Sequence, residues 1–121
     1  MAAVLQAIVE RGVTAAGRAR LPAEMVEIEA MVAATPAEGF CGCCAAIRDM
    51  DQREDIKAIT TPTHVIVGEH DPETPVSAAQ LIHEHIAGSG LTIIPDCAHF
   101  VHMKQADAFN RAMMGFLKDY V

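Results

Sequence analysis

Serine is nearly absent from this chain of 121 residues. The two serines, Ser77 and Ser89, both lie in the second half of the chain. Neither stands in the Gly-x-Ser-x-Gly sequence that presents a nucleophilic serine on a sharp turn between a strand and a helix. We therefore expect no nucleophile of this kind within the chain.

Basic residues are also scarce. Nine lysines and arginines stand against sixteen aspartates and glutamates, and the formal net charge is -7. A surface that binds nucleic acid needs a basic patch or stripe, and the few basic residues here are scattered among acids. We expect no nucleic-acid partner.

Long apolar runs are missing as well. No run approaches the roughly 20 apolar residues that a helix needs to cross a bilayer. The opening segment, residues 1–10, lacks the basic flank of a signal peptide. We expect a cytoplasmic chain with no membrane partner.

The four cysteines do not form the two C-x-x-C pairs of a zinc ribbon. Cys41, Cys43 and Cys44 are crowded together, and Cys97 lies far downstream. Their neighbours are small and apolar, which is typical of a tightly packed helix in which free cysteine acts as a small hydrophobic residue. This interpretation predicts no metal ligands; a disulfide or metal site is the alternative.

The organisation of the chain changes near Thr60. Before that point the apolar residues recur at helical spacing, as Met25, Ile28 and Val32 do, and a further helix is predicted over residues 37–50. The first sixty residues are thus predicted to be all-helical, with breaks or starts marked by Gly12, Gly17, Pro22 and Thr35-Pro36.

After Thr60 the pattern alternates between strands and helices. Short runs rich in β-branched and apolar residues predict strands over residues 63–67 and 91–94. Apolar stripes predict helices over residues 76–87 and 105–120. The order strand, helix, strand, helix predicts an α/β fold with parallel strands joined by a right-handed crossover.

Asp71 and His99 each follow one of the predicted strands. Because ligands bind outside the carboxyl ends of parallel strands, both residues are expected at the functional edge of the sheet. There His99 would act as a general base, and Asp71 would fix the imidazole tautomer and stabilise the imidazolium. The alternative for Asp71 is a purely structural turn in Asp71-Pro72.

These motifs carry a resemblance to a known family. Residues 59–121 resemble the C-terminal third of an α/β-hydrolase, and residues 34–51 resemble the end of the helical cap in 3-oxoadipate enol-lactonases, bacterial enzymes of aromatic-compound catabolism. The resemblance implies a helical cap segment over residues 1–58 and the C-terminal part of the hydrolase core over residues 59–121. It is carried by the following motifs: Gly68-Glu69-His70-Asp71-Pro72-Glu73-Thr74-Pro75, Ala98-His99 and Gln105-Ala106-Asp107-Ala108-Phe109-Asn110. The chain departs from the family at Lys104-Gln105-Ala106, where Glu-Gln-Pro is frequent.

The resemblance implies hydrolysis of 3-oxoadipate enol-lactone to 3-oxoadipate, in the β-ketoadipate pathway, through a Ser-Asp-His triad and without a metal or organic cofactor. The chain would contribute Asp71 and His99 only, so we expect it to be inactive alone. The small-molecule lactone carries a carboxylate, for which Arg48 is the candidate contact. The alternative is that Arg48 pairs with a nearby acid such as Asp49 or Asp51.

Two other functions stay open at this level. The chain could belong to another α/β-hydrolase, such as an esterase, a haloperoxidase-like or a dehalogenase-like enzyme, or it could be a non-catalytic module that binds a partner. Two short parallel strands leave both sheet edges unpaired, and helices suited to a wider sheet would expose apolar stripes. We therefore expect an oligomer, a missing N-terminal portion or partner chain, or marginal stability.

Overall fold

The computed structural model describes residues 1–120, apart from the side chain of Ala2, and contains a two-stranded parallel sheet. Strand β1 (His64–Gly68) pairs with β2 (Gly90–Ile94), with His64 opposite Gly90 and Gly68 opposite Ile94. Each strand lies within one residue of its predicted position. The prediction of an α/β fold with parallel strands is confirmed.

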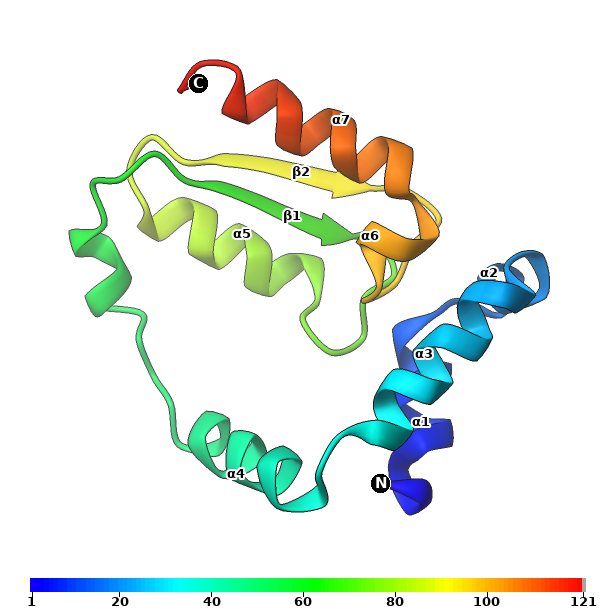
Figure 1. Ribbon diagram of the computed structural model, residues 1–121. Helices are drawn as coiled ribbons and strands as arrows, with labels where there is room; N and C mark the ends of the chain where they lie inside the picture. The colour runs from blue at the N-terminus through cyan, green and yellow to red at the C-terminus, as the bar shows by residue number, and fades with distance from the viewer. Residues whose placement is uncertain (121) are drawn as a thin grey trace.

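Two helices cover the sheet from opposite sides (Figure 1). Helix α5 (Val76–His85) forms the crossover between the strands, and α7 (Ala106–Leu117) packs on the other face. A short helix, α6 (Val101–Lys104), precedes α7 and was absent from the prediction. The backbone of Gln105, at φ -126° and ψ 47°, interrupts the helix between α6 and α7.

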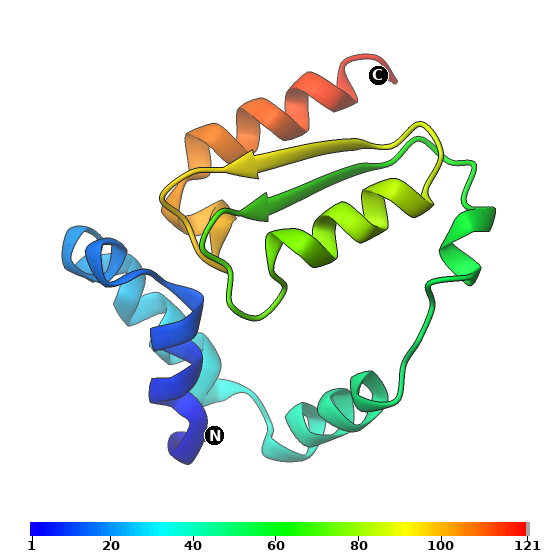
Figure 2. The same ribbon diagram turned by 180° about the vertical axis from the view of Figure 1, so that it is seen from behind.

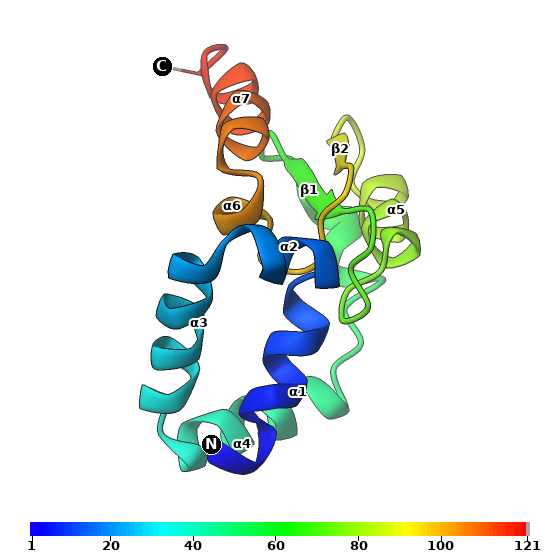
Figure 3. The ribbon, with the colours of Figure 1, turned by 90° about the vertical axis from the view of Figure 1, so that its right-hand side faces the viewer.

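The N-terminal helices α1 (Ala2–Gly12), α2 (Ala15–Arg20) and α3 (Pro22–Ala34) form a cluster beside α6 (Figure 3). Phe100 and Met103, from the C-terminal half of the chain, pack against the buried core of this cluster. The prediction that Met25, Ile28 and Val32 share one face of a helix is confirmed, because all three are buried on α3. They form one cluster with Val9 of α1 and Val13, which follows α1.

Gly17 does not break a helix, as its residue type had predicted, but lies buried inside α2. A Cβ at this position would stand 2.6 Å from Cε of Lys104 and 2.9 Å from a methyl group of Val13. The glycine therefore permits close packing between α2 and its neighbours. The other predicted boundaries are confirmed: Gly12 ends α1, Pro22 begins α3, and Thr35-Pro36 lies between α3 and α4.

Helix α4 (Ala37–Arg48) and the 3-10 helix η1 (Asp55–Ala58) belong to an arm that leads back to the sheet (Figure 2). No residue of α4 is buried. The prediction of a tightly packed cysteine helix is therefore wrong: Cys41, Cys43 and Cys44 are exposed, and only Cys97 is buried. Small apolar residues favoured packing, but no other element within residues 1–120 covers this helix.

Several apolar side chains are exposed on the elements that flank the sheet. Met114 of α7 is 56% exposed, Tyr120 is 57% exposed and Ile93 of β2 is 42% exposed. Within residues 1–120 each strand pairs only with the other, so each has an edge without a neighbouring strand. None of the described helices is by itself long and apolar enough to cross a membrane; only α3 and α4 counted together pass that test, and they meet at 88°.

Candidate active site

Asp71 and His99 meet at the carboxyl ends of the two strands. The loop after β1 carries Asp71, and the loop between β2 and α6 carries His99. Oδ2 of Asp71 lies 2.9 Å from Nδ1 of His99. The structure thus brings together the two residues that the sequence had placed separately at this edge.

The Asp71 carboxylate also organises its own loop. Oδ1 accepts hydrogen bonds from the backbone amides of Glu73, at 2.8 Å, and Thr74, at 3.0 Å. Oδ2 accepts one from the hydroxyl of Thr74 at 2.8 Å. Asp71 is therefore both a turn residue and the contact of His99, because Oδ1 binds the turn and Oδ2 faces both Thr74 and His99.

These contacts set the charge of the carboxyl group. Burial of Asp71 raises its pKa, but the amide of Thr74, the His99 ring, the Thr74 hydroxyl and the Glu73 amide together outweigh burial. The net result is a pKa below the ordinary value for aspartate. Asp71 is therefore ionised at neutral pH, as a group that stabilises an imidazolium must be.

The His99 side chain is partly exposed. Its side chain is 42% exposed, whereas that of Asp71 is 4% exposed. Nδ1 contacts Asp71, and no hydrogen bond from residues 1–120 engages Nε2. The ring also packs edge-on against Phe100, with centroids 5.8 Å apart. A histidine held at Nδ1 and open at Nε2 can accept a proton from a nucleophile and return it to a leaving group.

The two loops are held together by their backbones. The amide of Glu69 donates to the carbonyl of Ile94 at 2.9 Å, and the amide of His70 donates to that of Cys97 at 2.8 Å. Gly68 lies so close to this second loop that an added Cβ would stand 2.6 Å from the carbonyl oxygen of Cys97. The missing side chain of Gly68 lets the two loops approach each other.

Helix α1 supports the same edge from outside the sheet. The amide of Phe100, next to His99, donates to the carbonyl of Gly12 at 3.0 Å. Arg11 forms a 2.5 Å ion pair with Glu73 in the Asp71 loop. The N-terminal helices thus contact both loops that carry the site.

Sequence reasoning missed the roles of Gly68 and Thr74. The turn itself could be expected, because an aspartate before a proline commonly accepts hydrogen bonds from backbone amides a few residues on, but no signal pointed to the Thr74 hydroxyl. Gly68 was read only as the end of a strand, although glycine at such a position also marks a close backbone approach. Gly68 lies against the backbone of the His99 loop, whereas the Thr74 hydroxyl contacts both Asp71 and His99.

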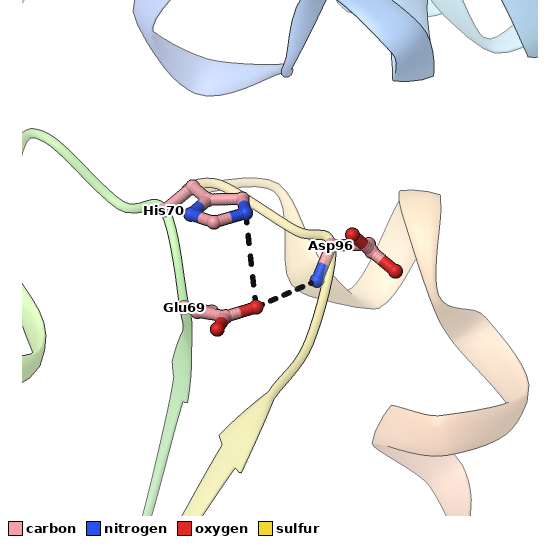
Figure 4. A group of neighbouring side chains, drawn as sticks. All are labelled: Glu69, His70 and Asp96. Carbon is pink, nitrogen blue, oxygen red and sulfur yellow. Dashed lines mark hydrogen bonds and ion pairs between the residues drawn. The ribbon is translucent and has the colours of Figure 1, made fainter.

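Among the described residues, one group has ligand atoms close enough to hold a metal ion. It consists of Glu69, His70 and Asp96, all exposed, with ligand atoms within 4.8 Å of one another. Oε2 of Glu69 accepts a hydrogen bond from the Asp96 amide at 3.2 Å and lies 3.7 Å from Nε2 of His70 (Figure 4). In this arrangement Glu69 joins the two loops beside the Asp71–His99 pair.

Arg48 lies at the end of α4 and is paired with its neighbour. Its guanidinium donates to the carboxylate of Asp49, with a shortest distance of 2.7 Å, and the arginine side chain is 74% exposed. This is the pairing considered as the alternative to substrate binding. Within residues 1–120, no hydrogen bond or ion pair links Arg48 to Asp71 or His99.

Comparisons with known proteins bear on this arrangement. No family model matches the sequence. The curated 3-oxoadipate enol-lactonase 2 of Acinetobacter baylyi is 36% identical over 84 residues, which cover 69% of this chain and 31% of the relative. The crystal structure of the enol-lactonase from Burkholderia xenovorans LB400 superposes with a TM-score of 0.93 at 30% identity over 98% of this chain. The chain belongs to the α/β-hydrolase superfamily.

Other α/β-hydrolases share the fold beyond the enol-lactonases. A bromoperoxidase from Bacillus anthracis superposes with a TM-score of 0.86 at 28% identity, over 97% of this chain and 44% of the bromoperoxidase. The architecture corresponds to the C-terminal portion of an α/β-hydrolase, with cap helices before a β-α-β-α unit. The chain spans about a third of the length of the curated enol-lactonases it matches.

Proposed function

We propose that this α/β-hydrolase chain provides the acid and base of an ester-hydrolysing site whose nucleophile comes from outside residues 1–121. The observation that supports this most directly is the 2.9 Å contact between Asp71 and Nδ1 of His99, with Nε2 of His99 left open. Neither serine of the chain contributes to this contact. Ser89, for example, is hydrogen-bonded to His83 of α5.

The reaction would run in two steps. Nε2 of His99 takes the proton of a serine hydroxyl while the serine oxygen bonds to the substrate carbonyl carbon, and the ester C–O bond then breaks as His99 protonates the leaving oxygen. Water attacks the acyl group in the second step, again with His99 as base, and releases the carboxylic acid and the serine. Asp71 stabilises the imidazolium in both steps.

For the substrate we propose an enol-lactone such as 3-oxoadipate enol-lactone. This is supported by the enol-lactonases among the sequence and structural relatives. Arg48 stays our candidate for the substrate carboxylate, which would compete with Asp49 for the guanidinium. We also propose a cytoplasmic location, which the four free cysteines favour because cytoplasmic thiols stay reduced.

A second candidate is hydrolysis of simple esters or a haloperoxidase-like reaction. The likeness to the bromoperoxidase from Bacillus anthracis supports it, because this protein shares the fold at nearly the same sequence identity. The acid and base would be the same two residues. The two candidates differ in the substrate that the site prefers.

The test restores the missing part of the fold. The chain is fused behind the segment of the Acinetobacter baylyi enol-lactonase 2 that precedes its matched region, and the fusion is assayed with 3-oxoadipate enol-lactone and p-nitrophenyl acetate. We expect the fusion to hydrolyse the lactone faster than p-nitrophenyl acetate. The chain alone should hydrolyse neither substrate. The variant His99→Ala should reduce the rate of the fusion by about 1000-fold or more.

The fold of the fusion is checked by circular dichroism, so that misfolding is not mistaken for inactivity. A folded fusion that is unaffected by His99→Ala would contradict the role of His99. Faster hydrolysis of p-nitrophenyl acetate than of the lactone would favour the second candidate.

A further inference from the structure

Helix α4 carries three exposed thiols within one turn, and the active site uses none of them. Cys41, Cys43 and Cys44 are free and exposed, and no residue of this helix is buried. Within residues 1–120, no hydrogen bond engages their sulfur atoms. The interpretation of these cysteines as small hydrophobic residues of a packed helix therefore does not hold.

The helix divides the three thiols between two faces. Cys41 and Cys44 are three residues apart, so their Cα atoms lie about 5 Å apart and their side chains diverge by only about 60° around the axis. Cys43 is two residues from Cys41 and points about 200° away from it. Residues one or two apart on a helix do not face each other, so only Cys41 and Cys44 can act on one ligand.

This C-x-x-C spacing can hold either a direct disulfide or an atom that bridges two thiolates, and the two differ in the sulfur separation they require. Residues three apart on a helix have Cβ atoms about 5–6 Å apart, whereas a disulfide needs about 3.5–4.5 Å. A direct S–S bond would therefore distort α4. A metal ion between the two thiolates separates the sulfur atoms by up to about 4.6 Å when each bond has the roughly 2.3 Å length of a zinc–sulfur bond, so the Cβ atoms need not approach as a disulfide requires.

We propose that Cys41 and Cys44 form a two-thiolate site for a soft monovalent cation of the Cu(I) class. Thiolates select soft ions such as Cu(I) and zinc, and zinc in structural sites takes four ligands, whereas the face of α4 offers two. Binding displaces both thiol protons: one Cu(I) and two thiols give a bis-thiolate complex and two protons. The metal stays Cu(I), so no electron is transferred.

The experiment is an anaerobic titration of the reduced chain with Cu(I), in competition with the chromophoric chelator bicinchoninate at pH 7. The wild-type chain should withdraw a single Cu(I) per chain from the chelator. Cys41→Ser and Cys44→Ser should each lower the affinity for Cu(I) by more than about 100-fold. A loss of this size exceeds the roughly 10–100-fold effect of removing a residue that only supports a metal ligand.

Cys43→Ser is the matched control, because it removes a thiol from the same turn but from the other face. It should bind Cu(I) as the wild type does, and the circular dichroism spectra of all three variants should agree. Equal losses in Cys43→Ser, or full retention in Cys41→Ser, would overturn the assignment. So would zinc binding as tight as that of Cu(I), or a dimer of the chain on sedimentation with Cu(I), which would indicate bridging between molecules. Hydrolysis is not measured, so the result is independent of the proposed function.

Discussion

Gly68, at the end of β1, lies directly against the carbonyl of Ala98 in the loop that carries His99. A Cβ on Gly68 would also stand 2.9 Å from the carbonyl carbon of Cys97. These neighbours are backbone atoms, which cannot move aside as a flexible side chain could. The contact between Asp71 and His99 therefore depends on the absence of a side chain at position 68.

The first prediction concerns this contact. Gly68→Ala should lower the free energy of unfolding by about 1–3 kcal/mol, the usual cost of forcing extra atoms into a packed region, and should separate His99 from Asp71. Urea denaturation measures the first effect, and the imidazole signals of His99 in the NMR spectrum measure the second. Gly42→Ala is the control.

Gly42 lies inside α4, and nothing would contact an added Cβ there. Because alanine favours a helix interior over glycine, Gly42→Ala should stabilise the chain by as much as about 1 kcal/mol or leave it unchanged. Equal effects of the two substitutions would contradict the close approach at Gly68.

The second prediction is a pH dependence. The folded state holds the pKa of Asp71 below its ordinary value. As the pH falls, the unfolded chain therefore takes up a proton on Asp71 before the folded chain does, and the free energy of unfolding decreases. The stabilisation from Asp71 should be complete above the ordinary pKa of about 4 and should be lost as the pH falls through the lower, folded pKa. Asp71→Asn should be less stable than wild type by about 1–3 kcal/mol at pH 7, with a smaller difference at acid pH.

Urea denaturation of both proteins between pH 3 and pH 7 provides the measurement. Glu84→Gln serves as its control, since Glu84 is an exposed acid of α5. A parallel fall in the stability of wild type and Asp71→Asn over this range would show that Asp71 does not carry the dependence.

The third prediction tests the role of Thr74. Its hydroxyl donates to Oδ2 of Asp71 at 2.8 Å and lies 3.5 Å from Nδ1 of His99. Thr74→Val should raise the pKa of the Asp71 carboxyl, because one of its hydrogen bonds is lost, and should cost about 1 kcal/mol of stability. Carbon-detected NMR titration of the carboxyl gives the pKa. Thr74→Ser, which keeps the hydroxyl, should behave as wild type, and an unchanged Asp71 pKa in Thr74→Val would refute the role.

The fourth prediction concerns the exposed apolar surface. We propose that the chain self-associates or binds a further chain through the unpaired edges of the sheet and the exposed face of α7, where Ile93 and Met114 are exposed. Sedimentation velocity should show a mass that rises with concentration, and Met114→Gln with Leu117→Gln should reduce the association. A monomer at every concentration, with a cooperative thermal transition, would be the contrary result.

Val26→Gln on α3 is the matched control for that experiment. Val26 is 66% exposed but lies in the N-terminal cluster, away from α7. A loss of association in Val26→Gln equal to that in the α7 variant would move the interface to the N-terminal helices.

Local sequence patterns determined most of the elements, though not α6, and the edge of the sheet at which Asp71 and His99 lie. The β-branched runs located β1 and β2 within one residue, since alternation and apolar content report how a segment is buried. The strand–helix–strand order required parallel pairing, which gathers the ends of the strands at one edge. Asp71 and His99 could therefore be placed at that edge from the sequence alone.

Tertiary structure decided whether these residues meet and what covers each helix. The 2.9 Å contact between Asp71 and His99 and the approach of Gly68 to Ala98 join loops that are far apart in the chain, and no local pattern encodes such distances. The exposure of Cys41 and Cys44 was decided in the same way. Helical spacing shows which residues share a face, but only the packing of other elements determines whether that face is buried.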